Sequence, residues 1–432
     1  MEFPMNSLPA EGRCPVAPIG FDLLDPAALR APSSAYVSAR QEMPVFWYPS
    51  LNVWIITCYQ DVFRYLNDQE SFRTSNRDAV TVPEGFAERY PASLLNHILP
   101  ALDPPALTAP KRVLQEGFSK PRLRSFEQRI TTRAHKLIDG FEAEGKADLL
   151  QAYCAPLTMH TLLGLLGLPD NDADRVRRLG DAAIRVLASA HVPLDEPELS
   201  EVWEEYIEGQ EYFRRIADER ATAPGDDVIS LLATATDDRA PAARLLDRER
   251  VALIVTELAF TGHDTTAQLM ASMLAHLSEF PALREELRRD PGLWPNVAEE
   301  SLRRHPPATF AARAAVRDLE IGGALIRKGD TAWFALAGAS NDPAHYDDPE
   351  VYDIRRPRPT DHLSFGRGPH ACPGSPLARL QATLGVRILL ERLPDLSTDP
   401  DDPATFAPTV IVSKRDRMPV RWSQVRQSPE LT

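Results

Sequence analysis

Cysteine is scarce in this sequence, and the scarcity excludes one large class of proteins. Among 432 residues there are four cysteines, Cys14, Cys58, Cys154 and Cys372, and none of them forms a CxxC pair. Single cysteines this far apart exclude a disulfide framework of the kind that stabilises small secreted proteins. We therefore expect a protein of the reducing cytoplasm.

Long apolar runs and an excess of positive charge are also missing. The first residues contain no basic region followed by an apolar run, so no signal peptide is predicted. No uninterrupted stretch of about 18 apolar residues occurs, so no transmembrane helix is predicted. The net charge of −14 argues against a nucleic-acid-binding protein, although it allows a local basic patch. The composition is that of a soluble globular protein.

The spacing of apolar residues predicts a chain that is mainly helical. Residues 122–145 and 155–223 are rich in Leu, Ala, Glu and Arg at helical spacing. Aromatic and β-branched residues in segment 44–66 predict a short strand pair followed by a helix. The fold class is therefore mainly α with small β-sheets.

Two later segments predict further β-structure. Residues 319–336 alternate in the manner of two strands joined by a Gly-Gly turn, and residues 408–422 resemble a terminal hairpin. The pattern offers no boundary between separate units. We expect residues 1–20 to form a flexible N-terminal segment and residues 21–432 to form a single domain.

The apolar stretch 251–274 predicts an unusually long helix. Asp247 is a suitable N-cap and Pro281 ends the pattern, so the helix would contain some 33 residues and measure about 50 Å. A helix of this length would cross the whole molecule. Its middle, TGHDTT at residues 261–266, nevertheless carries a carboxylate and hydroxyl groups.

The sequence FGRGPHACPG, residues 365–374, has the features of a loop that presents a thiolate. Gly366 and Gly368 permit backbone conformations that other residues resist. Pro376 suits the first turn of a helix, so Cys372 is predicted to lie directly before a helix N-terminus. The helix dipole and the N–H groups there lower the pKa of a thiol and stabilise the thiolate.

The residues around Cys372 restrict the metal that its thiolate can bind. Because Pro373 has no N–H, hydrogen bonds to the sulfur must come from Gly374 onward. A lone thiolate lacks the partner ligands of a zinc site. It suits the axial position of a haem iron.

The same loop resembles the haem-binding signature of the cytochrome P450 family, in which Phe, two Gly, a basic residue, Cys and a final Gly recur at this spacing. The matching residues are Phe365, Gly366, Gly368, His370, Cys372 and Gly374. The resemblance extends from about residue 20 to residue 422. It implies the cytochrome P450 fold, with a long central helix crossing over haem b, and it makes Cys372 the ligand of the haem iron.

Two further segments resemble landmarks of that family in the expected order. EESLRRHPP contains Glu300 and Arg303, and VYDIRRP contains Arg356. Taken alone, a Glu and an Arg three residues apart on a helix indicate a surface ion pair of small energetic value. Their position ahead of the cysteine loop favours the family's structural triad of Glu300, Arg303 and Arg356.

The resemblance also implies basic partners for the haem propionates. His370 and Arg313 take this role. A third contact usually comes from a His and an Arg after the motif DPP, but here Leu107 replaces the His and Lys111 stands in place of the Arg. Lys111 offers a point charge rather than a bidentate fork, and the adjacent Arg112 could substitute for it.

TGHDTT resembles the oxygen-activating segment of the same family. The resemblance makes Asp264 the proton source and Thr265 the hydroxyl that positions water and dioxygen, while Gly262 eases a local opening of the helix. An acid and a hydroxyl at this place can relay protons. Thr261 departs from the family pattern, and its hydroxyl is expected to bond the carbonyl of residue 257 and bend the helix.

Glu257 is the second departure on this helix face, and two interpretations of it stay open. It is either an exposed or ion-paired carboxylate, or a group that reaches into the pocket and meets a basic or donor group on the substrate. By family analogy the substrate pocket would also include Thr261, Gly262, Thr309, Phe310 and Ile411.

The leading functional interpretation is a haem-thiolate monooxygenase that hydroxylates or otherwise oxidises a small organic molecule, with secondary metabolism as one setting. Because the chain shows no reductase domain, electrons are expected from a separate ferredoxin and ferredoxin reductase, with Arg112 and Arg379 as candidate docking contacts. Neither a nucleic acid nor a membrane is an expected partner. Oxidative C–C or C–N coupling, peroxide-driven oxidation and a non-catalytic haem binder remain the alternatives.

Overall fold

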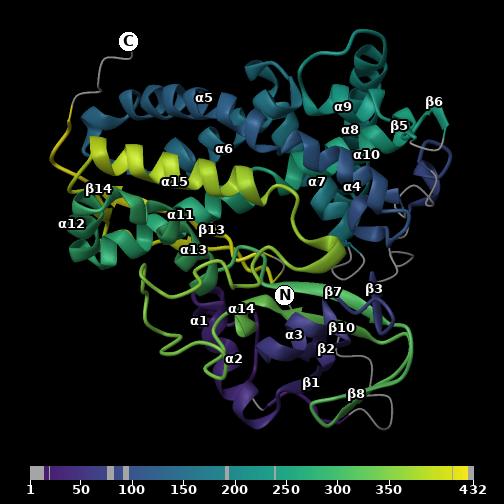
Figure 1. The fold of residues 1–432 in the computed structure, drawn as a ribbon, viewed down its shortest axis with the longest axis horizontal. Helices are drawn as coiled ribbons and strands as arrows, with labels where there is room; N and C mark the ends of the chain where they lie inside the picture. Colours follow the sequence, from purple (N-terminus) through teal and green to yellow (C-terminus); the bar gives the residue numbers. More distant parts are fainter. Residues whose placement is uncertain are drawn as a thin grey trace.

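The computed structural model describes residues 14–18, 20–74, 82–90, 97–189, 194–237, 240–410 and 412–426, so most of the expected N-terminal segment 1–20 lies outside the described residues. A large body of helices lies against a smaller part built around β-strands (Figure 1). The prediction of a mainly α protein with small β-sheets is confirmed.

The helices are α1 (Pro26–Arg30), α2 (Pro32–Glu42), α3 (Tyr59–Tyr65), α4 (Thr108–Gly117), α5 (Lys120–Asp139), α6 (Ala155–Leu166), α7 (Ala173–Ala188), α8 (Glu198–Thr222), α9 (Val228–Thr234), α10 (Arg248–Thr261), α11 (Asp264–Glu279), α12 (Pro281–Arg289), α13 (Trp294–Arg304), α14 (Leu336–Ala339) and α15 (Ser375–Arg392). The strands are β1 (Val45–Tyr48), β2 (Val53–Ile56), β3 (Phe72–Thr74), β4 (Lys146–Asp148), β5 (Thr236–Asp237), β6 (Ala240–Arg244), β7 (Phe310–Ala315), β8 (Leu319–Ile321), β9 (Ala324–Ile326), β10 (Thr331–Ala335), β11 (Ser397–Thr398), β12 (Thr405–Phe406), β13 (Arg415–Arg417) and β14 (Pro419–Arg421).

The predicted strand pair near the N-terminus is confirmed as β1 and β2, followed by α3. The two strands are antiparallel, with Trp47 opposite Trp54, and all their residues are buried. Aromatic and β-branched side chains pack well on such a pleated surface. β2 continues into a five-stranded sheet of order β1-β2-β10-β7-β3, which brings β7 to the central part of the molecule.

The predicted Gly-Gly turn between β8 and β9 is confirmed, whereas the predicted terminal hairpin is wrong. Gly322 and Gly323 both adopt positive φ, 56° and 78°, as a tight turn of this kind requires. β13 and β14, in contrast, pair with different partners: β13 with β12, and β14 with β11 and β4. Met418 alone separates β13 from β14, and one residue is too short for a hairpin turn.

Helix α15 passes through the middle of the helical body, beside α5 and against α11 and α13 (Figure 1). Polar side chains buried along it have partners. Gln381 donates from Nε2 to the carbonyl oxygen of Leu157 at 3.0 Å and to Oγ1 of Thr161 at 2.9 Å, which ties α15 to α6. Such pairing removes the cost of burying an amide. The start of α15 is thereby held in a fixed position.

The long central helix is present, but Gly262 and His263 divide it into α10 and α11. Asp247 caps α10, because its side chain accepts a hydrogen bond from the N–H of Arg250. Three side chains then bond backbone carbonyls around the break: Thr261 bonds residue 257, His263 bonds residue 259, and Thr265 bonds residue 261, each at 2.8 Å. Hydroxyls that bond carbonyls four residues back bend helices. The prediction that Thr261 bends the helix in this way agrees with the structure.

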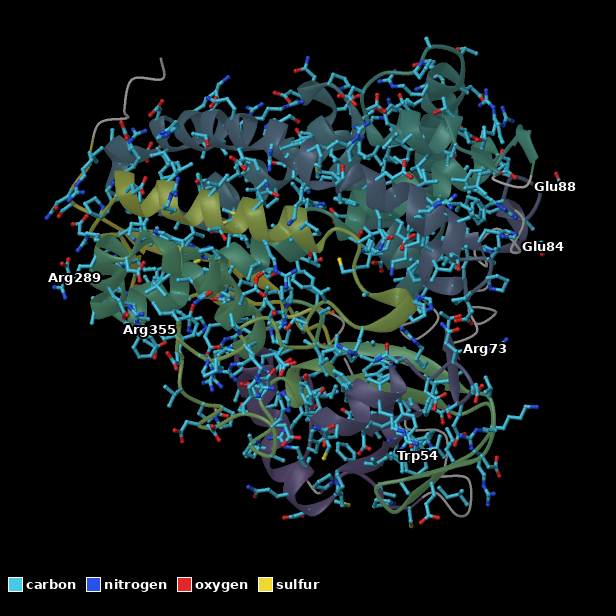
Figure 2. All side chains as sticks on the ribbon, in the orientation of Figure 1. Trp54, Arg73, Glu84, Glu88, Arg289 and Arg355 are labelled. Atoms are coloured by element: carbon cyan, nitrogen blue, oxygen red, sulfur yellow. The ribbon has the colours of Figure 1, made fainter. Side chains whose placement is uncertain are left out.

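Several charged side chains lie at the outside of the molecule. Arg289, Arg355 and Glu84 lie near the edge of the outline, while Trp54 lies within the β-rich part (Figure 2). Trp54 is fully buried and donates from Nε1 to Oδ2 of Asp330 at 2.8 Å. Within the described ranges, every helix is too short or too polar to cross a membrane.

Candidate active site

A cavity of about 380 Å³ lies between the Cys372 loop and the break of the central helix. Its walls come from α4, α6, α10, α11, β7 and the start of α15, and most of its lining side chains are apolar. Among the lining residues expected from the sequence are Lys111, Glu257, Thr261, Gly262, Thr265, Phe310, Arg313, Phe365, Gly366, His370, Cys372 and Gly374. The cavity therefore collects most of the site residues that the sequence singled out.

The loop that carries Cys372 has a fixed backbone. Gly366 and Gly368 have φ values of 64° and 68°, and the N–H of Cys372 donates to the carbonyl oxygen of Phe365 at 2.8 Å. A Cβ on Gly368 would lie 2.7 Å from Oδ1 of Asn67. This position therefore requires glycine both for its conformation and for its close approach to the segment after α3.

The sulfur of Cys372 is accessible from the cavity and lies at the N-terminus of α15. Burial from bulk solvent raises the pKa of the thiol, while the backbone N–H groups of Gly374 and Ser375 and the nearby charges of Lys111 and Arg379 act in the opposite direction. The donors thus begin at Gly374, as predicted from the missing N–H of Pro373. They are aimed at the atom that would ligate a metal.

Three basic side chains line the same cavity beside this loop. Lys111 donates from Nζ to the carbonyl oxygen of Pro369, and Arg313 donates from Nη1 to that of Ala312 at 2.7 Å. Nε2 of His370 lies 3.3 Å from Oδ1 of Asp103. Burial lowers the pKa of His370 to about 4, with Arg313 acting in the same direction. At neutral pH His370 is therefore a hydrogen-bonding partner rather than a cation.

The remaining expected propionate contacts lie differently. Leu107, which stands where the family has a histidine, is buried and belongs to the cavity lining. Arg112 follows Lys111 on α4, but its side chain is exposed and outside the lining. Of the two neighbours, Lys111 is thus the residue that faces the cavity.

Another part of the cavity wall is the region where α10 ends and α11 begins. Thr261, Gly262, Thr265 and Thr266 belong to the lining. The hydroxyl of Thr265 donates to the carbonyl oxygen of Thr261 at 2.8 Å and keeps two lone pairs that can accept hydrogen bonds. Hydroxyl groups and the cysteine loop therefore line the same cavity.

Asp264 does not belong to the cavity lining. Its Oδ2 lies 3.0 Å from Nζ of Lys414, and the two side chains are 26% and 37% exposed. Lys414 belongs to the segment before β13, far away in the sequence. The expected proton source is thus partly open to solvent and held in an ion pair, one residue from the hydroxyl that lines the cavity.

Glu257 lies on α10, one turn before Thr261. It is 9% exposed and lines the cavity, and its Oε2 accepts a hydrogen bond from the N–H of Leu99 at 3.1 Å. Of the first interpretation, an exposed or ion-paired carboxylate, the exposed form is wrong, and the ion-paired form stays open beside the pocket interpretation. The structure places the carboxylate at the cavity wall.

The other expected pocket residues divide into three cases. Phe310 lines the cavity, together with its neighbour Ala308. Thr309 is buried but outside the lining, and its hydroxyl donates to the carbonyl oxygen of Val410. Ile411 lies outside the described residues.

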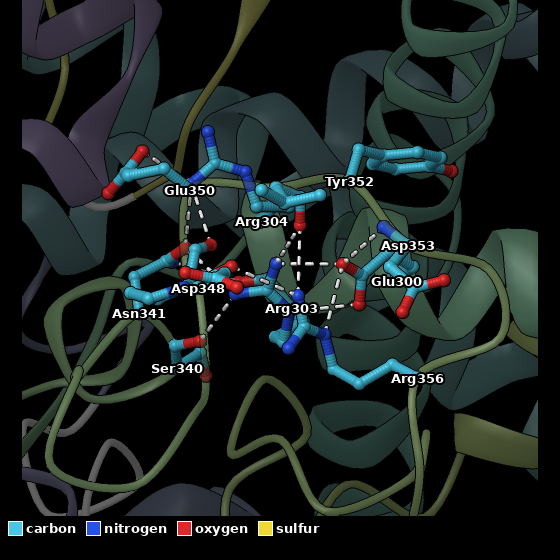
Figure 3. A network of polar contacts seen from close by, with 12 residues as sticks. Glu300, Arg303, Arg304, Ser340, Asn341, Asp348, Glu350, Tyr352, Asp353 and Arg356 are labelled. Atoms are coloured by element: carbon cyan, nitrogen blue, oxygen red, sulfur yellow. Dashed lines mark hydrogen bonds and ion pairs between the residues drawn. The ribbon is translucent and has the colours of Figure 1, made fainter.

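Glu300, Arg303 and Arg356 form one buried cluster (Figure 3). Arg303 donates from Nη2 and Nε to the two oxygens of Glu300 at 2.7 and 2.9 Å, and Nε of Arg356 lies 3.3 Å from Oε1. Arg303 also reaches the carbonyl oxygen of Ser340 and Oδ1 of Asn341. A buried charge cluster with this many partners fixes α13 to the segment that contains Arg356 and precedes the cysteine loop.

A second buried cluster lies next to the first and escaped the sequence analysis. The carboxylate of Glu299 accepts hydrogen bonds from Arg379 at 2.6 and 2.9 Å, and Nε2 of His362 lies 3.0 Å from it. The guanidinium of Arg379 also lies over the ring of Phe365, 4.5 Å from its centroid. Arg379, expected as a docking contact, is therefore already engaged in holding the cysteine loop.

Comparison with known proteins decides the family. A family model described as "Cytochrome P450" matches residues 293–417. The cytochrome P450 monooxygenase PikC of Streptomyces venezuelae is 30% identical over 388 residues, covering 88% of each chain. The chain belongs to the cytochrome P450 family.

Solved structures of cytochromes P450 share its fold. CalO2 superposes with a TM-score of 0.84 at 28% identity, covering 94% of this chain and 99% of that chain. Another, from work on unusual P450-like monooxygenases involved in microbial secondary metabolism, has a TM-score of 0.78 at 28% identity and covers 88% and 95%. The chain is therefore an oxidoreductase of cytochrome P450 type.

The residues of the cavity fit the haem that membership of this family implies. A haem offers one iron and two propionate carboxylates. The cavity presents the Cys372 sulfur with two backbone donors, and Lys111, Arg313 and His370 in the same lining. The donor set and the charges thus match the group.

Proposed function

We propose that this protein is a haem-thiolate monooxygenase that uses dioxygen and ferredoxin-derived electrons to hydroxylate or otherwise oxidise a small organic molecule. The observation that carries the proposal is that Cys372 and Thr265 line one and the same cavity. When bound, haem b supplies dioxygen activation at an iron whose thiolate ligand favours O–O cleavage.

The chain's own residues have separate tasks in this proposal. Cys372 would ligate the iron, Lys111 and Arg313 would neutralise the propionates, and His370 would hydrogen-bond to them. Asp264 takes protons from solvent, to which it is 26% exposed, and Thr265 passes them through water into the cavity. The apolar lining keeps bulk water away from the reacting substrate.

The carbon monoxide difference spectrum of the reduced protein tests the ligand. We expect the thiolate-type spectrum from the unmodified protein and its loss in Cys372→Ser. A thiolate-type spectrum that survived this substitution would contradict the assignment of Cys372.

Oxygen-18 labelling separates the proposed reaction from its alternatives. A monooxygenase incorporates one atom of labelled dioxygen into product. Product formed without label indicates oxidative C–C or C–N coupling. Turnover with peroxide, combined with no turnover with ferredoxin and NAD(P)H, indicates the peroxide-driven reaction.

The redox partner is proposed to dock at the face of the Cys372 loop. Arg112 is exposed there, whereas Arg379 already shares its charge with Glu299. We expect Arg112→Glu to reduce ferredoxin-supported turnover and its salt dependence while leaving turnover by a chemical reductant unchanged. Equal losses with both reductants would contradict docking at this face.

Location and setting follow from the same proposal. We place the protein in the cytoplasm, where the reductase that supplies electrons and the free thiols of Cys14, Cys58, Cys154 and Cys372 are compatible. We place it in secondary metabolism on its likeness to the solved monooxygenase associated with that setting.

A further inference from the structure

The wall of the cavity formed by α10 carries a carboxyl group, that of Glu257, to which the proposed reaction assigns no role. Glu257 is the one acidic side chain among the described residues that line the cavity. The proposed proton route runs through Asp264 and Thr265, which lie seven and eight residues further along. Another task must therefore account for a carboxylate at this place.

The basic residues of the cavity are directed elsewhere. Lys111 donates to Pro369 and His370 contacts Asp103, so both are bound at the end of the cavity that holds the Cys372 loop. Arg313, on β7, donates to the backbone of its own strand. In the proposed function these three groups bind the carboxylates of the haem, whereas Glu257 belongs to the part of the wall formed by α10.

The surroundings of Glu257 are apolar. Leu162 and Leu165 of α6, Ile254 and Leu258 of α10, and Leu99 share the lining with it. In such a wall, shielded from bulk water, a hydrogen bond between a carboxylate and a charged donor is stronger than in water. A ligand with a positive charge would make this bond while its apolar part contacts the leucines.

The hydrogen bond from the N–H of Leu99 orients the carboxylate of Glu257 through one of its two oxygens. Leu99 begins a short 3₁₀ turn, Leu99–Ala101, and donates its N–H to Oε2 of Glu257 at 3.1 Å. A carboxylate accepts about four hydrogen bonds in total. The bond from Leu99 therefore fixes the direction of a group that can bind more than one donor.

We infer that Glu257 binds a protonated nitrogen of the substrate, so that the substrate is an apolar molecule with one basic amine. This inference rests on the proposed monooxygenase function and names its substrate class. Eight residues separate Glu257 from Thr265, which corresponds to about 12 Å along a straight helix. The carbon that is oxidised should therefore lie on the order of 10 Å from the amine nitrogen.

Spectral titration of the haem-loaded protein with two matched probes tests the inference. N,N-dimethyldecylamine is protonated at neutral pH, and 1-decanol is a neutral molecule with the same chain. The variants are Glu257→Gln, which keeps an acceptor for the Leu99 N–H without the charge, and Glu257→Leu, which removes both.

We expect Glu257→Gln to weaken binding of the amine by about 10- to 100-fold and that of the alcohol by less than about twofold, as for a lost charged hydrogen bond. An unchanged ratio of amine to alcohol affinity in Glu257→Gln would overturn the inference. A third outcome would also overturn it: Glu257→Leu weakens binding of both probes equally, while Glu257→Gln weakens neither. Glu257 would then only hold the backbone at Leu99.

Failure of this inference is distinguishable from failure of the proposed function. The thiolate-type carbon monoxide spectrum of each variant reports on Cys372 independently of the probes. If that spectrum is present and the affinity ratio does not change, only the substrate class is wrong. Thermal unfolding of the same variants, with and without amine, gives a second readout: the amine should raise the midpoint of the unmodified protein more than that of Glu257→Gln.

Discussion

His276, which is buried on α11, and His305, which is half-buried directly after α13, are expected to make this fold sensitive to acid. Nε2 of His276 lies 3.0 Å from Nδ1 of His305, and the ring of Tyr352 stacks on His276 with centroids 4.2 Å apart. Burial lowers the pKa of His276 to about 3, and three nearby arginines act in the same direction. Burial likewise holds the pKa of His305 well below its usual range, with His276 and the same arginines adding to the effect.

The direction of the pH dependence follows from these lowered pKa values. In the unfolded chain a histidine titrates near its ordinary value of about 6.5, so the unfolded state binds the proton first as the pH falls. Stability is therefore complete above that pH and decreases below it. With a folded-state pKa of about 3, His276 alone removes about 2 kcal/mol of unfolding free energy between pH 7 and pH 5.

Denaturant unfolding of the haem-loaded protein at pH 7 and pH 5 measures this loss. Between pH 7 and pH 5, His276→Gln should lose about 2 kcal/mol less unfolding free energy than the unmodified protein. This holds even if the variant is less stable at both pH values. His97→Gln, at a half-buried site away from the pair, is the control for losing a histidine as such. Equal pH dependence in the unmodified protein and in His276→Gln would refute the reasoning.

Three further substitutions test other contacts. Lys414→Gln removes the ion partner of Asp264, and we expect product formed per NAD(P)H to fall by up to about tenfold with an unchanged carbon monoxide spectrum; unchanged coupling would show that the pair is not needed. Glu299→Gln leaves a buried cluster without its anion and should lower the unfolding free energy by about 2–4 kcal/mol, measured by denaturant titration; a change below about 0.5 kcal/mol would contradict this. Gly368→Ala forces a side chain into positive φ and against Asn67, which should cost about 1–3 kcal/mol and reduce the thiolate-type spectrum, whereas Gly374→Ala should be tolerated.

Local patterns were sufficient to predict much of this structure. The strand pair β1–β2, the Gly-Gly turn, the N-cap at Asp247 and the start of α15 each depend on a few neighbouring residues. The glycines and the missing N–H of Pro373 likewise predicted where donors to the Cys372 sulfur lie. Such features are readable because their physical cause lies within one or two turns of chain.

Contacts between distant segments could not be predicted in the same way. Lys414 pairs with Asp264 across 150 positions, and Arg379 was expected at a docking surface although it bonds Glu299 on another helix. The prediction of a terminal hairpin was wrong for a related reason: β13 pairs with β12, and β14 pairs with β4 and β11, instead of with each other. A charge or a strand edge has many possible partners, and only packing selects one.

The break of the central helix depends both on local hydrogen bonds and on its place in the cavity wall. Thr261, His263 and Thr265 bond the carbonyls of residues 257, 259 and 261, so the backbone groups around the break keep partners within the chain. A break satisfied in this way needs no ligand to keep its shape. This part of the cavity wall is therefore preorganised. The carbonyl of Glu257 accepts from Thr261, and the carbonyl of Thr261 accepts from Thr265, so Glu257 and Thr265 are held in a fixed relative position. Thr261→Val removes one of these hydrogen bonds. It should therefore make the relative position of Glu257 and Thr265 less fixed and weaken binding of the amine at Glu257, even though the carboxylate itself is unchanged.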